Sequence, residues 1–266
     1  MLKDITIGQY IPGDSFTHKL DPRTKILISI FFIASLFVID KFIGYLLVVG
    51  FLAVVIINSK VPLGFIFKGL KPIVFLILLT AILNLFMIRG TEDSLLFQWS
   101  FIRIYSEGVR TAMFMALRLV FLIVGTSMLT LTTSPIELTD GIEMLLKPIG
   151  KARAHELAMM MTIALRFIPT LTEETDKIMK AQKARGANFE DGNIIQRAKS
   201  LIPILVPLFI NSFRRADELA MAMESRCYRG GSGRTRMKKL QFTSRDVIGV
   251  AIFSVVFIGS IITRLV

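Results

Sequence analysis

Long runs of apolar residues alternate with shorter polar segments along the chain. The runs occupy residues 26–39, 42–57, 73–88, 111–132 and 247–263. An α-helix needs about 20 apolar residues to cross a bilayer, and the third run reaches that length if it begins near Phe65. The pattern predicts an all-α membrane protein with about five transmembrane helices.

The first two runs are separated only by Asp40 and Lys41. Each run is short for a span, so together they form either a helical hairpin or one tilted helix. We interpret them as a hairpin in which the flanking Arg23, Lys25 and Lys60 extend their charged ends toward the membrane surface.

A different pattern fills the segment between the fourth and fifth runs. In residues 153–185 and 193–226, apolar positions recur at alternating spacings of three and four. This period is typical of long amphipathic helices. Pro169 is expected to kink or divide the first helix, and Pro203 and Pro207 are expected to bend the second.

Three shorter pieces belong to the same segment. Residues 135–148 begin with a proline and end before another, which predicts a short helix. Residues 201–210 (LIPILVPLFI) are too short to span, so we expect them at the membrane interface or beneath a partner, with a re-entrant segment as the alternative. Residues 229–239 (RGGSGRTRMKK) predict a flexible basic linker beside the membrane.

The placement of lysine and arginine predicts the orientation. Nineteen of the 32 Lys and Arg residues lie in 133–246, and four lie in 1–25. Since cytoplasmic segments accumulate these residues, we expect the N-terminus and 133–246 in the cytoplasm, and the 89–108 loop and C-terminus outside. The predicted domains are an N-terminal membrane domain with four transmembrane helices (1–132), a cytoplasmic coupling-helix domain (133–246) and a C-terminal transmembrane helix (247–266).

The same bias explains the net charge of +12 without a nucleic-acid partner. The sequence contains neither a phosphate-binding G-x-x-x-x-G-K-[ST] motif nor a G-x-S-x-G nucleophile motif. One cysteine, Cys227, excludes an internal disulfide, and two histidines leave too few ligands for a structural zinc site. We therefore predict that the chain is not an enzyme, with no catalytic residue, metal or cofactor of its own.

Arg118 is the clearest charge inside a predicted span. It either pairs with a polar group of a partner or is satisfied within the bundle by backbone carbonyls or Asn84. A proton- or ion-coupled carrier usually places acidic groups in its spans, and the spans of this chain contain few charges. A self-sufficient secondary carrier is therefore one alternative to a subunit of a larger transporter, and a non-transport membrane scaffold is another.

Both long cytoplasmic helices are predicted to end in an arginine between small residues. The two tips read Ala184-Arg185-Gly186 and Ser225-Arg226-Cys227. Helix capping explains either arginine taken alone. Two such tips on a chain without its own ATPase motif indicate two matching sockets on a dimeric partner, where each guanidinium can pair with a carboxylate.

Several motifs resemble, in order and spacing, those of the transmembrane T component of energy-coupling factor (ECF) transporters. They are Tyr10-x-Pro12-x-x-Ser15-x-x-His18-x-Leu20-Asp21-Pro22-Arg23-x-Lys25, Thr133-Ser134-Pro135 with Leu138 and Gly141, Leu165-Arg166-Phe167-Ile168-Pro169, and Ala181-Gln182-x-Ala184-Arg185-Gly186. The resemblance covers nearly the whole chain. It implies the membrane-embedded coupling subunit of an ABC-type importer for vitamins or other micronutrients, in a bacterial or archaeal cell membrane.

The resemblance also implies the partners. In that family, two Ala-Arg-Gly tips dock into two ABC-type ATPases, which bind ATP and Mg²⁺, and the helices behind the tips cradle a small membrane-embedded S component that binds the substrate. The docking residues implied here are Ala184, Arg185, Gly186, Ser225, Arg226 and Cys227. Ser225 and Cys227 depart from the family's pattern and are assigned by position only.

Two further expectations concern residues outside the tips. The N-terminal block, including His18 and Asp21, is assigned to folding of the membrane entry. Eight of the 13 methionines lie in 133–246, and flexible methionines suit exchange of more than one S component, although ordinary helix packing explains them about as well. A metal-transporting version of the same family is a further alternative, which this subunit alone would not reveal.

Overall fold

The structure is a computed structural model that describes residues 10–88, 95–99, 102–187, 189, 193–230 and 240–265. It divides into two compact units, which are considered separately. The membrane unit comprises Gly8–Gly141 and Lys238–Val266, and the second unit comprises Met1–Ile7 and Ile142–Met237. These boundaries differ from those of the domains 1–132, 133–246 and 247–266, which describe membrane topology and stay a prediction.

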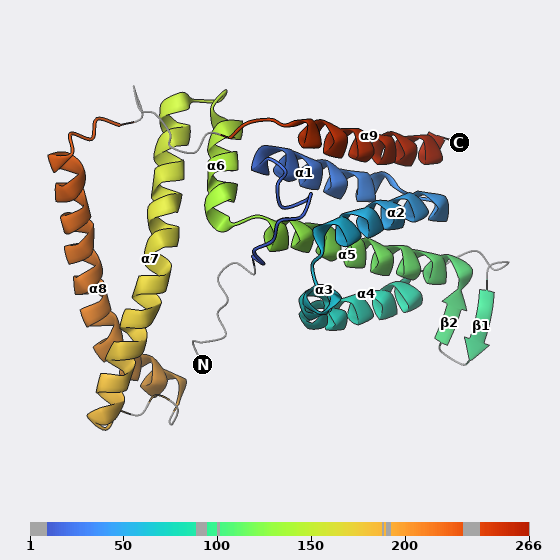
Figure 1. The fold of residues 1–266 in the computed structure, drawn as a ribbon. Helices are drawn as coiled ribbons and strands as arrows, with labels where there is room; N and C mark the ends of the chain where they lie inside the picture. The colour runs from blue at the N-terminus through green and yellow to red at the C-terminus, as the bar shows by residue number, and fades with distance from the viewer. Residues whose placement is uncertain are drawn as a thin grey trace. The chain divides into compact units, whose positions relative to one another are not determined.

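The membrane unit is built from apolar helices that follow the runs in the sequence (Figure 1). In chain order they are α1 (Pro22–Val38), α2 (Phe42–Ser59), α3 (Leu63–Leu70), the 3₁₀ turn η2 (Lys71–Ile73), α4 (Val74–Met87), α5 (Ser106–Thr132) and α9 (Ser244–Leu265). The predicted hairpin is confirmed, because α1 and α2 are separate helices. Pro72 lies in the 3₁₀ turn between α3 and α4, where its missing amide donor leaves no α-helical hydrogen bond to break.

Four helices of the described chain are long and apolar enough to cross a membrane. They are Phe42–Ser59, Leu63–Met87, Ser106–Thr132 and Ser244–Arg264. At 17 residues, α1 is shorter than these and lies at the lower limit of known spans. The structure therefore supports a multi-pass membrane protein with four to five spans.

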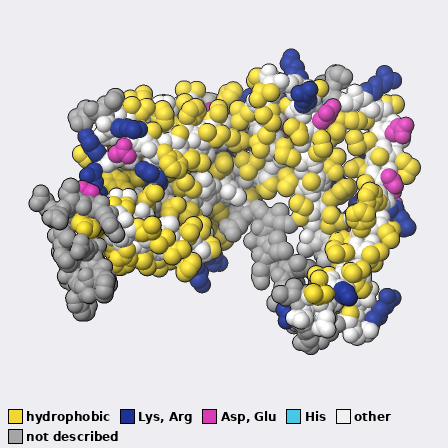
Figure 2. Space-filling view, turned by 180° about the vertical axis from the view of Figure 1, so that it is seen from behind, with side chains coloured by type: hydrophobic (Ala, Val, Ile, Leu, Met, Phe, Trp, Pro, Cys, Tyr) yellow, Lys and Arg dark blue, Asp and Glu magenta, His cyan; other side chains and the backbone are white. Residues whose placement is uncertain are grey.

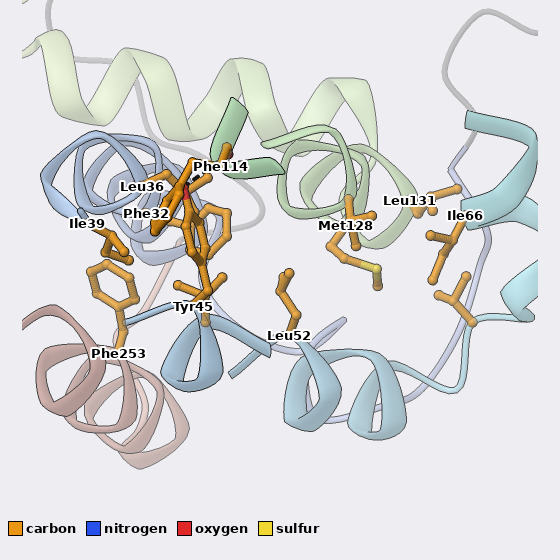
Figure 3. Packing of buried hydrophobic residues seen from close by; sticks show 13 residues of the cluster. Phe32, Leu36, Ile39, Tyr45, Leu52, Ile66, Phe114, Met128, Leu131 and Phe253 are labelled. Carbon is orange, nitrogen blue, oxygen red and sulfur yellow. Dashed lines mark hydrogen bonds between the residues drawn. The ribbon is translucent and has the colours of Figure 1, made fainter. Parts of the chain in front are cut away.

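Close packing of α1, α2, α5 and α9 forms the core of the membrane unit. Phe32 of α1, Tyr45 of α2, Phe114 of α5 and Phe253 of α9 are all buried (Figure 3). The Tyr45 hydroxyl donates to the Phe114 carbonyl at 3.3 Å. Gly125 lies directly against the Phe32 ring, which leaves no room for a Cβ atom. Because lipid is as apolar as these side chains, fit between helices rather than water exclusion holds them together.

The outer faces of the membrane unit are apolar. Leu46, Phe75 and Val255 expose 72%, 75% and 72% of their surfaces. Figure 2 shows a surface dominated by hydrophobic side chains, with Lys and Arg side chains in separate small groups. Contiguous exposure on this scale is unfavourable in water and is expected for a surface that faces lipid.

A small antiparallel hairpin connects α4 and α5 in the sequence. It consists of β1 (Leu95–Trp99) and β2 (Ile102–Tyr105), with Trp99 paired to Ile102. The sequence predicted only a loop over 89–108, and the hairpin is an addition to that prediction. The hairpin is a minor addition, and the all-α membrane class is confirmed.

The second unit contains two long helices that run in opposite directions. They are α7 (Lys151–Ala184) and α8 (Ile194–Ser225), which contact each other (Figure 1). The shorter α6 (Pro135–Leu146) precedes them in the sequence, and the division between the units falls within it, after Gly141. Pro169 does not divide α7, and α8 continues through Pro203 and Pro207. Residues 201–210 are accordingly part of one continuous helix.

Candidate functional site

The first arginine tip is a helix end closed by a Schellman motif. Arg185 is the C-cap of α7, and Gly186 has a left-handed backbone with φ +87°. The Gly186 N–H donates to the Lys183 carbonyl at 3.0 Å, and the Ala187 N–H donates to the Gln182 carbonyl at 3.0 Å. These two bonds satisfy carbonyls at the helix end and turn the chain away directly after the arginine.

The second tip repeats this geometry. Arg226 is the C-cap of α8, and Cys227 has a left-handed backbone with φ +55°. The Cys227 N–H donates to the Glu224 carbonyl at 2.8 Å, and the Tyr228 N–H donates to the Met223 carbonyl at 3.0 Å. Cys227 therefore takes the backbone position that Gly186 takes in the first tip, even though the two side chains differ.

The six predicted docking residues are all exposed. Within the described ranges, neither Arg185 nor Arg226 makes a hydrogen bond or ion pair through its side chain. A free guanidinium offers five donors in a planar fork that matches a carboxylate or a row of carbonyls. Each tip therefore presents one unused cation at the end of a long helix.

The antiparallel pairing brings the six residues together in two groups, not one. Thr162 of α7 lines a hollow beside Arg226, whereas Arg185 lies 23 residues further along the same helix (185 − 162). At 1.5 Å per residue this separation is about 35 Å. A single socket could not hold both arginines, whereas two sockets on one partner assembly could.

The hollow beside Arg226 has a volume of about 610 Å³. Met159, Thr162 and Ile163 of α7 and Leu219 and Met223 of α8 line it, together with residues 226–230. Side chains from two helices meet there, so no local pattern in the sequence indicated it. The hollow gives the second tip a space into which a partner's side chain can enter.

An apolar face runs along α8 between its two ends. Its exposed large side chains are Leu201, Ile202, Leu205, Val206, Phe209, Ile210 and Phe213. They include most of the run that was expected at the membrane interface or beneath a partner. A face of this size on a helix outside the membrane unit indicates a surface that another apolar body covers.

Polar contacts at the start of α1 and α9 tie the membrane unit together. Asp246 accepts the Asp21 N–H at 2.7 Å, and it accepts both the N–H and the hydroxyl of Thr243 at 2.8 Å. Asp21 in turn accepts the Arg23 N–H at 2.9 Å and pairs with the Arg23 guanidinium at 2.8 Å. Asp246 was not among the residues predicted from the sequence, although a carboxylate directly before the last apolar run is a signal for such a role.

Lys25 lies inside this junction. Its ammonium donates to the carbonyls of His18 and Thr132 at 3.1 and 2.9 Å and to the Thr133 hydroxyl at 3.1 Å. The prediction that Lys25 extends to the membrane surface is wrong, because three acceptors hold it in the interior. The contacts join the N-terminal segment to the end of α5, which supports a folding role for the N-terminal block.

Arg118 is held in part by the backbone, although its buried Nε has no hydrogen-bond partner among the described residues. Its Nη2 donates to the Ile39 carbonyl at 3.2 Å, and its guanidinium lies 5.3 Å from the centre of the Phe37 ring. Ile39 is the C-cap of α1, where a cation complements the partial negative charge of the helix end. Asn84 instead donates to the Thr80 carbonyl, so the backbone interpretation of Arg118 is the one supported.

Comparison with known proteins gives long matches. A family described as cobalt transport protein (CbiQ) matches residues 13–237. A relative from Clostridium kluyveri, named energy-coupling factor transporter transmembrane protein EcfT, is 65% identical over 100% of this chain and 98% of its own. Relatives of the same name from Thermosediminibacter oceani and Bacillus subtilis are 60% and 48% identical, over 100% and 92% of this chain and 100% and 93% of theirs.

Proposed function

Because this chain belongs to the CbiQ family and is the transmembrane component of an energy-coupling factor transporter, we propose that it couples two ATPase subunits to a substrate-binding S component. ATP binding closes the two ATPases, which also hold Mg²⁺. The arginine tips move with their sockets, and α7 and α8 pass that movement to the S component. The chain supplies mechanical coupling and no chemical step.

The observation that carries this proposal is the matched pair of tips. Arg185 and Arg226 occupy the same position in the same capping motif, and both are exposed at opposite ends of an antiparallel helix pair. The capping hydrogen bonds use only the backbone of these residues, and among the described residues the guanidinium groups make no hydrogen bond or ion pair. Two equivalent sockets on a pair of ATPases would use both groups.

The apolar face of α8 supports an S component as the second partner. It extends from Leu201 to Phe213 on one helix, and an integral membrane protein can cover such a face. Exposed methionines of the same unit, Met160 and Met221, suit a surface that repacks against different partners. We propose that more than one S component is exchanged here.

The S component would select the substrate, which we propose to be a vitamin or another micronutrient. The family's description refers to cobalt, so a metal ion is the alternative cargo. We propose a bacterial or archaeal cell membrane as the location, with the N-terminus and 133–246 in the cytoplasm. The bias of Lys and Arg toward that segment supports this orientation.

Affinity purification from native membranes in mild detergent tests the proposal. We expect recovery of one or two ABC-type ATPases and a small hydrophobic protein. Recovery of the chain alone, with transport surviving reconstitution, would instead show a self-sufficient carrier. Recovery of unrelated partners without transport would show a scaffold.

Arginine variants test the docking assignment. We expect Arg185→Ala and Arg226→Ala each to weaken ATPase retention about tenfold or more, because the socket loses its partner. The double variant should lose retention altogether, since neither contact remains to support the other. Arg214→Ala, an exposed arginine of α8 away from the tips, is the matched control. Unchanged retention and uptake in all three tip variants would reject the assignment.

A further inference from the structure

A polar cluster joins α7 and α8 between their two tips. The Asn211 side-chain amide donates to Glu174 Oε1 at 2.6 Å. Arg215 Nη2 lies 3.6 Å from Glu174 Oε2. The Glu174 and Arg215 side chains are only 21% and 33% exposed, so the cluster belongs to the contact between the helices and not to a solvated face.

The contacts of this cluster are incomplete. Glu174 Oε2 and Arg215 Nη1 are buried, and neither has a hydrogen-bond partner among the described residues. A separation of 3.6 Å is an ion pair but exceeds the usual length of a hydrogen bond. Buried charged groups are normally fully hydrogen-bonded. A relative shift of the helices by less than about 1 Å would bring the two groups to the distance of a charge-assisted bond.

The cluster lies between the two tips, where movement of either tip can reach it through the helix. Glu174 precedes Arg185 by 11 residues (185 − 174), and Asn211 precedes Arg226 by 15 (226 − 211), or about 17 and 23 Å of helix. Pro169 lies five residues before Glu174, and Pro207 lies four before Asn211. Each proline removes one amide bond from its helix, so both helices can bend most easily close to the cluster.

We propose that Glu174, Asn211 and Arg215 form a latch that makes α7 and α8 move as one body, so that displacement of one tip is passed to the other. They are positioning residues, because they touch neither the ATPases nor the substrate. The Asn211 contact holds the crossing in place, and the Glu174–Arg215 pair tightens or loosens as the helices shift. This inference rests on the proposed function, because it gives the two tips a common mechanical link.

The test uses the complex with its ATPases and S component in lipid nanodiscs and proteoliposomes. Glu174→Gln removes the charge but keeps an oxygen for Asn211, and Glu173→Gln is the neighbouring exposed control. One spin label is placed at Lys180→Cys, near the tip of α7, and the other at Met221→Cys, near the tip of α8, in a Cys227→Gly background. The pair reports the distance between the two tips. The charge exchange of Glu174→Arg with Arg215→Glu tests rescue.

We expect the complex with Glu174→Gln to retain its ATPases and to hydrolyse ATP at a rate within about twofold of the unchanged complex. The amount of substrate taken up per ATP should fall at least about fivefold. The interspin distances should broaden and lose their response to ATP. Glu173→Gln should behave as the unchanged protein, and the charge exchange should restore most of the lost coupling.

Two results separate the latch from the function on which it rests. If Glu174→Gln lowers the amount of folded complex but leaves uptake per ATP and the ATP-dependent distances unchanged, the cluster is structural and the latch is rejected. If the unchanged chain retains no ATPase at all, the coupling function fails first, whatever the variants do.

Discussion

The left-handed backbone at Gly186 and Cys227 turns the chain away directly after each arginine. A side chain with a Cβ atom costs about 1 kcal/mol in this conformation, and glycine avoids that cost. Cys227 nevertheless adopts φ +55° and makes both Schellman hydrogen bonds. The tip geometry is therefore fixed by backbone bonding, which explains how a Ser-Arg-Cys sequence can match Ala-Arg-Gly.

Reciprocal substitutions at these two positions should have opposite effects on stability. We expect Gly186→Ala to lower the free energy of unfolding by about 1 kcal/mol and Cys227→Gly to raise it by up to about that amount. Thermal unfolding of the purified protein in detergent measures both. Arg214→Ala, at an exposed position of α8 away from both caps, is the control and should change stability little. A shift in the same direction for both substitutions would contradict the equivalence of the two caps.

Three arginines of the membrane unit contact the turn that follows α1. Arg118 donates to the Ile39 carbonyl, Arg110 donates to the Asp40 carbonyl at 3.4 Å, and Arg264 pairs with the Asp40 carboxylate at 3.5 Å. The three cations surround the C-terminal end of α1, where free carbonyls carry partial negative charge. The charge of Arg118 within a span therefore contributes to the capping of a neighbouring helix.

At the scale of elements, the junction of α1 and α9 depends on one carboxylate. Asp246 is buried and accepts hydrogen bonds from both the Asp21 and Thr243 backbones. We expect Asp246→Asn to lower the free energy of unfolding by about 2 kcal/mol, because a buried charge-assisted bond is weakened and an amide donor is left facing other donors.

The exposed neighbour Arg245 provides the control for this prediction, since Arg245→Gln should change stability little. Thermal unfolding gives the comparison, and ATPase retention by the folded fraction should be equal in both variants. Loss of retention at normal stability would show that the junction belongs to a docking site and not to folding.

The helices themselves were predictable from the length of each apolar run and from the three-and-four spacing of apolar residues in the amphipathic segments. α2 begins at the first residue of its run, whereas α5 begins at Ser106, five residues before the predicted start at 111. The first turn of α5 begins with Ser106, Glu107 and Gly108, so it carries little apolar signal. Pro169 did not divide α7, because a proline removes only one amide hydrogen bond and the flanking turns keep theirs.

The contacts between α7 and α8 could not be predicted in the same way. Glu174 and Asn211 are 37 residues apart, and their meeting depends on how one helix is rotated against the other. The hollow beside Arg226 has the same origin. The arginine tips were predictable because capping is local, whereas the latch and the hollow depend on the register of two distant segments.

At the scale of the whole molecule, the two units have different proposed roles, which are anchoring in the membrane and binding of partners. The membrane unit is stabilised by helix packing and a buried polar junction, and its outer faces are apolar. The second unit holds the exposed tips and the exposed face of α8. Features that need rigidity and features that need free surface are thus separated along the chain, as expected for a subunit that anchors in lipid and binds partners.

The single cysteine provides a direct test of orientation and assembly together. Cys227 is exposed and adjoins Arg226, and the bias of Lys and Arg predicts a cytoplasmic position for it. A membrane-impermeant maleimide should therefore fail to label intact cells and should label them after permeabilisation. Cys227→Ser combined with Arg264→Cys is the matched control, because a cysteine at the C-terminal end should react in intact cells.

Bound ATPases should also protect this thiol, because the docking site would cover it. We expect slower labelling in the assembled complex than in the purified chain, and recovery of the fast rate in Arg226→Ala, which keeps the cysteine but loses the contact. Labelling of Cys227 in intact cells would reverse the assigned orientation and remove both tips from cytoplasmic ATPases. Equal rates with and without the partners would leave the orientation standing but place the docking surface away from the second tip.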